Sequence, residues 1–579
     1  MARAVLLKRL VISVCRQLLF RHIPRLLSSW KHMIISCLFV LLVTNIIVFY
    51  KGCRSTFLFG EPTGFGKEKH GHVMNFPEHH FEKEYFNKGA HPVIENLMPM
   101  TVPLTVHFVW CNQRHFQFQN YLSVLGAYKF LHPVEILFHY SWEPELDSVA
   151  YYQFYADLLR DIPVFFSKSL EDTAICTSEV GVKVTHIASL LNKYGGIYID
   201  INTIISQNLN PLREKRFSYM VEKSSSKETK HILLMLMGKD VISSEVSIEQ
   251  LMSNPNVSCT LPSSYSMSHE ATFCVHVDHE MFPVDIFELQ TDFGQLARWV
   301  GYGTKSVLRP QPHKSPVIPN IVHYVWLGSN TFSFFSYLSL LSTLHVLKAD
   351  AVYIHGDHYP TGKYWDKMKG NERVEFIFRE VPSTVFGHTI GAKLSHASDF
   401  IRVDVLLRYG GIYMDWDVLW VNSIPESLRK YDFVACADWP RTGSYPDVFN
   451  MGLIAASNES VFLQYFMESF RHYIDSHWSY NAIHMPYKVY EKHPDQLFHY
   501  RHFQVICAEF KCHPVWMDGY KDDDVNHLTT ARFDWRRDIL ALHWTYPDPP
   551  EFDNEEILRS SHGMFSDIGK YILEKAGIN

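Results

Sequence analysis

Residues Leu394–Val421 read LSHASDFIRVDVLLRYGGIYMDWDVLWV and contain two predicted elements joined by a turn. The first part, to Arg408, is typical of a helix. Its Asp399 and Arg402 are three residues apart, which places both side chains on one helical face. Such a pair is either a surface ion pair or, beside a bound ligand, a rigid set of acceptor and donor groups. Two glycines then predict a turn into a strand-like run.

The strand-like run, Ile412–Val421, holds Asp415 and Asp417. Residues i and i+2 of an extended segment point to one face, so the two carboxylates would repel each other unless a cation lay between them. Oxygen ligands favour a hard divalent ion, Mg²⁺ or Mn²⁺. Such an ion would neutralise the charge that grows on a diphosphate leaving group. Trp416 would point to the other face and pack. The alternative is a solvated Asp-x-Asp, which is how we interpret residues 522–524.

An earlier segment, Val184–Ile205, reads VTHIASLLNKYGGIYIDINTII and repeats the shape of this stretch at an offset of 215. Val102–Trp110 matches Ile318–Trp326 at an offset of 216. A repeat this long indicates a duplicated domain rather than a solenoid. The proline-rich run Arg309–Pro316 predicts the linker between the two copies.

Each copy alternates strand-like and helix-like runs, which predicts an α/β fold with a sheet flanked by helices. Ligands of such sheets bind at the carboxyl ends of the strands. We name residues 101–310 the first module and residues 316–579 the second module. In the second module the predicted strands are Val317–Trp326, Ala351–His355 and Ile412–Val421, and the predicted helices are Phe332–Leu347 and Leu394–Arg408.

The N-terminal part predicts a membrane anchor. Met33–Tyr50 has 18 residues and no charge. At about 1.5 Å per residue it can just span a hydrocarbon core of roughly 30 Å. The heavier basic flank precedes it, so residues 1–32 would be a cytoplasmic tail and the body would be lumenal, after a stem at residues 51–100. A cleaved signal peptide and a mitochondrial transit peptide are the alternatives; the run is long and starts late for a signal peptide.

Composition indicates a globular body of more than one domain. The chain has 579 residues, 47% of them hydrophobic and 20% charged. That length exceeds what one core usually holds. Nine Lys/Arg and no acidic residue precede position 55, which leaves 45 basic against 61 acidic residues in the remainder. An acidic body argues against nucleic acid as a partner.

The cysteines form no C-x-x-C pair, so zinc-ribbon and thioredoxin-like sites have no support. Cys259 with Cys274, and Cys507 with Cys512, are candidates for local disulfides in an oxidising lumen. Asn256 and Asn458 begin N-x-S sequons, which give the secretory interpretation weak support.

The segment SDFIRVDVLLRYGGIYMDWDV resembles the signature of the family 32 glycosyltransferases, which carry a DXD-containing sugar-binding region. This family includes yeast-type initiating α-1,6-mannosyltransferases and animal α-1,4-glycosyltransferases, and the glucosylating clostridial toxins share a similar core. VIPNIVHYVWLG is similar to the strand that opens such domains. The resemblance covers Ile318–Val421. It implies two tandem GT-A-like nucleotide-sugar-binding domains and an enzyme that uses Mn²⁺ or Mg²⁺.

The resemblance also implies roles for single residues. Asp399 and Arg402 would hold the donor sugar, and Trp326 would stack on the nucleotide base. Asp415 would contact the ribose or sugar, and the metal partly through water. Asp417 would bind the metal directly.

Two further residues follow from the resemblance less closely. His543, in Ala-Leu-His-Trp-Thr-Tyr, is the candidate for a metal or phosphate contact near the C-terminus, with a core position as the alternative. Asn450 resembles a donor-site asparagine near the acceptor side. Retention of stereochemistry is implied by the family alone. No residue stands out as a nucleophile, and we interpret Asp438 and Asp447 as loop residues.

The first module keeps the scaffold of the repeat and loses most of its polar groups. At the offset of 215, Val184 replaces Asp399, Ile187 replaces Arg402, Asn202 replaces Asp417, and Asp200 persists. We interpret this module as a degenerate domain that binds acceptor, positions the second module or mediates dimerisation. A second active site with altered chemistry is the alternative.

Together these observations predict a type II, single-pass Golgi membrane glycosyltransferase that moves a hexose from a UDP- or GDP-linked sugar to a glycan, glycolipid or glycoprotein. The rival interpretation is a catalytically silent, membrane-anchored carbohydrate-binding or scaffold protein. A body that faces the cytosol is a third possibility, which glycans on Asn256 or Asn458 would exclude.

Overall fold

The structure is a computed structural model of the chain. It describes residues 101–578 except 147–150, 171–175, 177–181, 183, 222–230, 244–246, 252–257, 261, 263–271, 439–444, 510 and 517–533. All described residues belong to one compact unit, His72–Asn579. The predicted tail, membrane span and stem, the sequon at Asn256 and the Asp-x-Asp at 522–524 lie outside the described residues. Within the described part of the chain, no helix has both the length and the hydropathy to cross a membrane.

The second module is built on a seven-stranded mixed sheet of order β12-β11-β10-β15-β18-β17-β19. The first four strands of that order run parallel, and β18 is antiparallel to both of its neighbours. The α/β fold class is therefore confirmed. The strands are β10 (Ile321–Trp326), β11 (Ala351–Gly356), β12 (Val374–Phe378), β15 (Gly411–Met414), β17 (Phe433–Ala437), β18 (Phe449–Ala456) and β19 (Phe498–His499).

The predicted single strand Ile412–Val421 is wrong, because the chain changes sheet within it. β15 ends at Met414, and β16 (Val418–Trp420) belongs to a second sheet of order β16-β22-β20-β21. A turn joins them, in which the Val418 N–H donates to the carbonyl oxygen of Asp415 over 3.2 Å. The other strands of this sheet are β20 (Gln504–Ala508), β21 (Lys511–His513) and β22 (Ala541–Tyr546).

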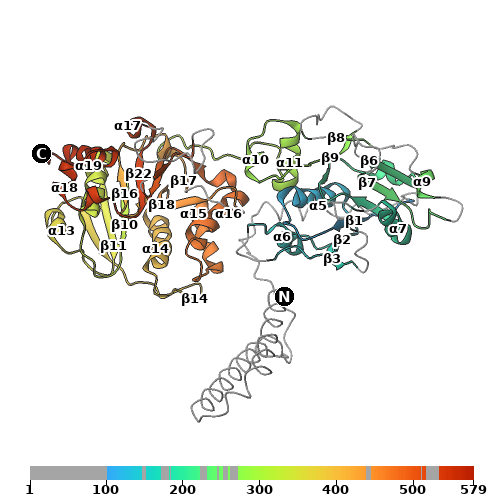
Figure 1. The fold of residues 1–579 in the computed structure, drawn as a ribbon, viewed down its shortest axis with the longest axis horizontal. Helices are drawn as coiled ribbons and strands as arrows, with labels where there is room; N and C mark the ends of the chain where they lie inside the picture. Colours follow the sequence, from blue (N-terminus) through green and yellow to red (C-terminus); the bar gives the residue numbers. More distant parts are fainter. Residues whose placement is uncertain are drawn as a thin grey trace, which may run out of the picture. The chain divides into compact units, whose positions relative to one another are not determined.

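Both faces of the large sheet are buried, as expected for parallel strands. Val322 and Tyr324 of β10 belong to one hydrophobic cluster, with residues of α12 (Phe334–Ser342) and α19 (Met564–Lys575). Helix α19 is the red helix near the C-terminus in Figure 1. Val325 of the same strand belongs to another cluster, with residues of α14 (Leu394–Tyr409) and α15 (Val461–Ser469). Helix α14 matches the predicted helix Leu394–Arg408 to within one residue, and Thr343–Leu347 continues α12 as a π-helical turn.

The large sheet of the first module repeats the order of the first six strands of the seven-stranded sheet. Its six-stranded sheet runs β3-β2-β1-β4-β7-β6, and its small sheet runs β5-β9-β8. Helices α5 (Phe118–Leu131) and α11 (Asp292–Tyr302) contribute to one of its core clusters, and α7 (Val184–Tyr194) contributes to another. The strands are β1 (Thr105–Trp110), β2 (Glu135–Tyr140), β3 (Phe165–Ser169), β4 (Gly196–Ile199), β5 (Thr203–Ile205), β6 (Phe217–Val221), β7 (Ile232–Met237), β8 (Ser258–Thr260) and β9 (Thr272–His276).

A chain of hydrogen bonds ties the first strands of the large sheet to the Gly-Gly turn. His323 Nδ1 lies 3.0 Å from His355 Nε2, and His323 Nε2 lies 2.9 Å from the Gly410 carbonyl oxygen. Arg379 Nε donates to His355 Nδ1 over 3.2 Å. Since arginine only donates, each imidazole N–H must point onward toward Gly410. Burial lowers the pKa of His323 to about 4 and that of His355 to about 3.

The first module has the same hydrogen-bonded arrangement, formed by His107, His139 and Gly195. His107 lies 3.1 Å from both His139 Nε2 and the Gly195 carbonyl oxygen. The glycine after the turn has a positive φ in both modules, +122° at Gly196 and +110° at Gly411. A Cβ on Gly411 would stand 2.6 Å from the carbonyl oxygen of the first residue of β10. The shared Gly-Gly therefore serves the fold rather than the chemistry.

Three disulfides join described residues. Cys259–Cys274 and Cys507–Cys512 confirm the two predicted pairs. Cys111–Cys176 is a third, which sequence spacing did not suggest. Cys436 is the free cysteine of the described part, and it is buried.

Candidate functional site

Three side chains of the second module converge at the point where β15 gives way to β16. The ligand atoms of Asp415, Asp417 and His543 all lie within 4.8 Å of one another. His543 Nε2 is 3.2 Å from Asp417 Oδ1. That carboxylate oxygen is buried and has no hydrogen-bond partner among the described residues. A buried anionic oxygen without a donor is costly, and a bound cation would remove that cost.

The turn, rather than an extended strand, brings the two carboxylates together. Asp415 stands where β15 ends and Asp417 where β16 begins. Strand β22 then pairs with β16 in a register that sets Val418 opposite His543. The two carboxylates are separated by one residue in sequence, whereas the imidazole comes from a strand near the C-terminus. The sequence could suggest His543 only through the family resemblance.

The charges of this cluster are unbalanced. Burial raises the pKa of Asp415, and the negative charge of Asp417 adds to this, although Arg402 opposes both effects. Burial disfavours the charged form of His543, but the charges of Asp417 and Asp415 outweigh it and raise its pKa. Two carboxylates and one imidazole are ligands that divalent ions such as Mn²⁺ accept. The residues present therefore fit a divalent cation.

Asp399 and Arg402 form a buried ion pair on α14, directly beside the cluster. Arg402 Nη2 lies 2.9 Å from Asp399 Oδ1 and 3.7 Å from Asp415 Oδ1. Its Nη1 donates to the Met451 carbonyl oxygen over 2.8 Å, and its guanidinium covers the Tyr413 ring at 4.6 Å. Burial raises the pKa of Asp399 to about 6, against the pull of the arginine. The pair is thus part of the site and not a surface i,i+3 contact.

Trp326 and Trp416 lie against each other at the end of β10. Their rings meet edge to face, with centroids 5.5 Å apart. Trp416 stacks on Tyr324 and donates its indole N–H to the Val325 carbonyl oxygen over 2.8 Å, so its packing position agrees with the prediction. Trp326 is 8% exposed, and its indole nitrogen has no partner among the described residues.

Gly452 is a site residue that sequence reasoning missed. Its carbonyl oxygen accepts a hydrogen bond from the Asp415 N–H over 2.8 Å. A Cβ built on it would stand 2.4 Å from His543 Cε1 and 2.6 Å from Asp415 Oδ2. The position thus leaves a cradle that any side chain would fill. Its position two residues after Asn450 did not predict a role in the site, because a glycine within a strand often marks a bulge or a bend.

Asn450 lies behind the metal ligands and is fully engaged. Its Oδ1 accepts from the Gly452 N–H over 2.9 Å and from Gln504 Nε2 over 3.2 Å, and its Nδ2 donates to Asp438 Oδ1 over 3.2 Å. Gln504 in turn lies 3.2 Å from His543 Nδ1. Gln504 is the second residue that the sequence did not reveal, since nothing in the run Gln504–Ala508 marks it.

The strand registers identify which residues of the first module stand at these positions. Thr203 pairs with His276 in the way that Val418 pairs with His543. His276 is therefore the counterpart of His543. An offset of 267 separates the two histidines, compared with 215 for the preceding strand, so the sequence repeat did not reveal their correspondence.

The same reasoning applies to the strand beside the carboxylates. The Asp200 N–H donates to the Leu233 carbonyl oxygen over 3.0 Å, as that of Asp415 does to Gly452. Leu233 therefore carries an isobutyl group at the position where the second module has room for hydrogen only. By the same count, two residues earlier, His231 stands for Asn450.

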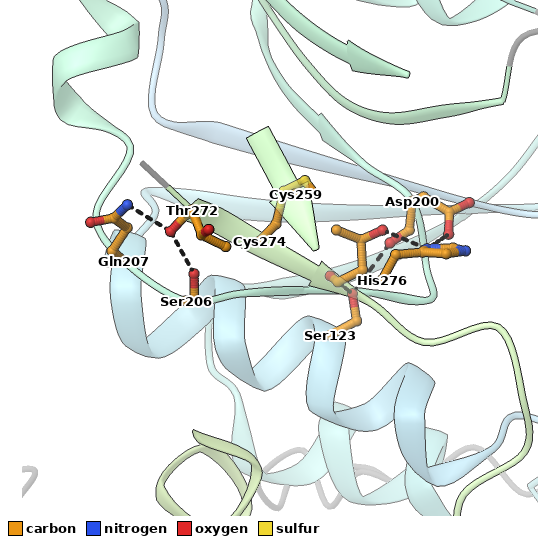
Figure 2. Close-up of a disulfide and its surroundings, with 9 residues drawn as sticks. Ser123, Asp200, Ser206, Gln207, Cys259, Thr272, Cys274 and His276 are labelled. Carbon is orange, nitrogen blue, oxygen red and sulfur yellow. Dashed lines mark hydrogen bonds and ion pairs between the residues drawn. A yellow bond between two sulfur atoms is a disulfide. The ribbon is translucent and has the colours of Figure 1, made fainter. Parts of the chain in front are cut away.

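In the first module, protein groups already satisfy the remaining aspartate (Figure 2). Figure 2 shows Asp200 beside His276, close to the strand that carries Cys274. Asp200 accepts from the Asn202 N–H over 2.9 Å, and its carboxylate lies 3.1 Å from His231 Nε2 and 3.7 Å from His276 Nδ1. Burial would raise the pKa of Asp200, but these histidines outweigh it and lower the pKa.

The amide that replaces the second aspartate is also occupied. Asn202 Oδ1 accepts a hydrogen bond from Asn120 Nδ2 over 2.7 Å. The guanidinium of Arg114 covers the Trp110 ring at 4.0 Å. The negative charge of Asp200 favours the charged form of this arginine, which burial disfavours. The first module therefore supplies positive charge and hydrogen bonds of its own, whereas the second module leaves Asp417 Oδ1 without a hydrogen-bond donor among the described residues.

Comparison with known proteins agrees with this site. Residues 357–434 match the family model described as a glycosyltransferase sugar-binding region containing a DXD motif. Glucan organizing enzyme 1 of Cryptococcus neoformans var. grubii serotype A is 25% identical over 228 residues, which are 37% of this chain and 60% of that protein. The chain thus matches less than two thirds of this relative's length.

Solved glycosyltransferases are similar to parts of the chain. The apo structure of the bifunctional glycosyltransferase WbbM aligns over 53% of this chain and 55% of its own, with 12% identity and a TM-score of 0.30. The galactosyltransferase LgtC in complex with donor and acceptor sugar analogues aligns over 44% of this chain and 95% of its own, with 12% identity and a TM-score of 0.25. The family match confirms the predicted resemblance for this part of the chain: residues 357–434 of the second module match a DXD-containing glycosyltransferase sugar-binding region.

Proposed function

We propose that the second module is a metal-dependent hexosyltransferase of GT-A-like fold. It would move a hexose from a UDP- or GDP-linked sugar to a glycan, glycolipid or glycoprotein, with retention of stereochemistry as in the family it resembles. The observation that carries this proposal is the meeting of Asp415, Asp417 and His543 around a buried carboxylate oxygen that has no hydrogen-bond donor among the described residues.

The ion, Mn²⁺ or Mg²⁺, would be held by Asp417 and His543, with Asp415 contributing directly or through water. When bound, it supplies positive charge to the diphosphate of the donor as the sugar leaves. Arg402 Nη2 lies 2.9 Å from Asp399 Oδ1 and so fixes the orientation of the Asp399 carboxylate. That carboxylate would accept hydrogen bonds from hydroxyl groups of the donor sugar. Trp326 would offer its ring to the nucleotide base. A front-face substitution led by the diphosphate needs no protein nucleophile.

We propose a non-catalytic role for the first module. Three features support it: the hydrogen-bonded amide of Asn202, the side chain of Leu233 where the metal cradle would be, and the neutralised carboxylate of Asp200. The matching strand orders support a tandem duplication with domains at residues 101–310 and 316–579. The module would bind acceptor, position the second module or form a homodimer.

We also propose that the chain is a type II Golgi membrane protein. The support is the uncharged run Met33–Tyr50 with its basic N-terminal flank, together with three disulfides in the body, which are typical of an oxidising lumen. A glycan on Asn458 in the protein from secretory cells would place the body in the lumen. Full modification by a cytosolic probe at an engineered surface cysteine would exclude that placement.

The test of the proposed activity is donor hydrolysis by the purified full-length chain across a panel of UDP- and GDP-sugars, with and without Mn²⁺. We expect hydrolysis of one donor class, lost on chelation and reduced at least 100-fold by Asp417→Asn. The matched control is Asn202→Asp, at the corresponding position of the first module, which should leave the rate unchanged. Unchanged hydrolysis in Asp417→Asn would refute the metal assignment.

The rival function, a silent carbohydrate-binding protein, makes a different prediction in the same experiment. It predicts no hydrolysis of any donor and no Mn²⁺-dependent binding of UDP or GDP, while glycan binding persists. The buried Asp399–Arg402 pair beside the carboxylates favours the enzyme, because a silent protein would have no reason to retain an ion pair there at the cost of desolvation.

A further inference from the structure

We propose that Gln504 is a positioning residue that fixes the tautomer of His543 and so sets the affinity of the metal site. The inference rests on the proposed metal-dependent function. It concerns a residue that contacts neither the ion nor the substrate but holds a residue that contacts the ion.

The evidence is a chain of buried side-chain amides behind the metal ligands. His543 Nδ1 lies 3.2 Å from Gln504 Oε1, and Gln504 Nε2 lies 3.2 Å from Asn450 Oδ1. Asn450 Nδ2 lies 3.2 Å from Asp438 Oδ1. Gln504 is 1% exposed, so the protein rather than bulk water must satisfy its amide.

The direction of every bond in this chain is determined. Asn450 Oδ1 accepts from the backbone N–H of Gly452 over 2.9 Å, which identifies that atom as the oxygen. The Gln504 atom beside this oxygen must then be the donating NH₂ group, Nε2. The Gln504 atom that faces His543 must therefore be the amide oxygen, Oε1. Asn450 Nδ2 is left to donate to the carboxylate of Asp438, which only accepts when ionised.

The consequence for His543 follows directly. An amide oxygen at Nδ1 requires a proton on Nδ1, so the lone pair of the neutral imidazole lies on Nε2. Nε2 is the nitrogen 3.2 Å from Asp417 Oδ1, on the side of the metal ligands. Partners of this kind on the far nitrogen of a metal-binding histidine fix ring orientation and raise ligand basicity, and their loss typically costs about 10–100-fold in metal affinity.

The first module supports this assignment by contrast. The register that pairs Gln504 with Ala541 places Cys259 and Cys274 at the corresponding positions, where they form a disulfide. In this module His276 Nδ1 lies 3.1 Å from Thr203 Oγ1. The first module therefore has a disulfide at the place of Gln504, and the Nδ1 of its histidine, rather than Nε2, faces the aspartate.

The experiment measures Mn²⁺ affinity of the full-length chain by electron paramagnetic resonance, which requires no turnover. Gln504→Glu keeps an oxygen acceptor for the Nδ1 proton, whereas Gln504→Met keeps the length and removes the acceptor. Gln464→Met, on the exposed face of α15, is the matched control. We expect Mn²⁺ binding at least 10-fold weaker in Gln504→Met, and within threefold of wild type in Gln504→Glu and in the control.

Thermal unfolding separates positioning from a structural role. A buried glutamate is less well tolerated than a buried methionine, so Gln504→Glu should unfold at the lower temperature although it binds Mn²⁺ more tightly. Equal Mn²⁺ affinity in Gln504→Met and wild type would overturn this inference alone, as would affinity that simply followed unfolding temperature across the variants. Absence of Mn²⁺ binding by the wild-type chain would overturn the proposed function and this inference together.

Discussion

At the scale of single residues, the charged groups of the site lie close together beside Gly452, where there is no room for a side chain. Asp399, Arg402, Asp415 and Asp417 lie within one continuous motif and were predicted. They meet in the structure, with Arg402 3.7 Å from Asp415. Gly452 was missed, because its function is to have no side chain and the cost of a Cβ depends on atoms from β22.

The cradle at Gly452 gives the first prediction. Gly452→Ala should lower kcat/KM for donor hydrolysis at least 100-fold and weaken Mn²⁺ binding, because the new Cβ would overlap His543 Cε1 and Asp415 Oδ2. Steady-state kinetics and Mn²⁺ titration measure both effects. Gly301→Ala on α11 is the control, since its Cβ would meet only side-chain ends of Leu122 and Phe118. A Gly452→Ala enzyme within threefold of wild type would contradict the cradle.

The geometry of Arg402 gives the second prediction. Arg402→Lys keeps the charge but cannot bridge Asp399 and the Met451 carbonyl oxygen while it covers Tyr413. We expect kcat/KM to fall at least 10-fold and the folded chain to persist. Arg408→Lys is the control on the same helix, because that arginine is exposed and pairs only with the i−4 carboxylate of Asp404. Equal activity in Arg402→Lys and Arg408→Lys would show that charge alone matters.

At the scale of elements, periodicity predicted helix α14 well and the following strand poorly. A helix over Leu394–Arg408 was predicted and Leu394–Tyr409 is observed. The prediction succeeded because the hydrogen bonds of a helix are local, so the residues that determine it lie within the segment itself. Ile412–Val421 is largely apolar on either side of its two aspartates, and local pattern cannot show that Gly411–Met414 pairs with β10 while Val418–Trp420 pairs with β22. Sheet membership depends on partners distant in sequence, which is why the turn at the carboxylates was not predicted.

The histidine chains between strands give the third prediction, on pH. Burial lowers the pKa of His323 from 6.5 to about 4. Between pH 6.5 and pH 4, this histidine is therefore protonated in the unfolded chain and neutral in the folded chain. The stability associated with the neutral ring is present above pH 6.5 and is lost as pH falls toward 4. His323→Gln has no such proton. The stability gap between wild type and variant should therefore narrow by about 2 kcal/mol between pH 7 and pH 5.

Chemical denaturation of wild type and His323→Gln at both pH values measures that gap. The difference between the two proteins isolates this residue from other groups with the opposite sign, such as Asp399, whose pKa is raised to about 6. His477→Gln, at an exposed histidine, is the control for the substitution itself. A gap that stayed constant or widened toward pH 5 would contradict the neutral histidine chain.

At the scale of the whole molecule, the repeat predicted two modules with one scaffold, and the strand orders agree with it. The offset of 215–216 holds through β4 and β15 and then changes to 219 and 267 as segments of different length intervene. Insertions of this kind hide correspondences from sequence. The structure alone therefore aligned His276 with His543 and Leu233 with Gly452.

That alignment gives the fourth prediction, on the first module. Asp200→Ala should leave Mn²⁺ affinity and donor hydrolysis within twofold of wild type, although Asp200 corresponds to Asp415. It should lower the unfolding temperature instead, because it leaves His231 and His276 without their shared carboxylate. Asp415→Ala is the matched variant and should weaken Mn²⁺ binding at least 10-fold. Loss of donor hydrolysis in a folded Asp200→Ala chain would show a second functional site.

The central claim is that one module of two carries the metal chemistry, and the number of Mn²⁺ ions bound per chain tests it most directly. We predict one tight Mn²⁺ per wild-type full-length chain in the presence of UDP or GDP, and none in Asp417→Asn. Two equivalent ions per wild-type chain, or one ion that persisted in a folded Asp417→Asn chain, would contradict the account.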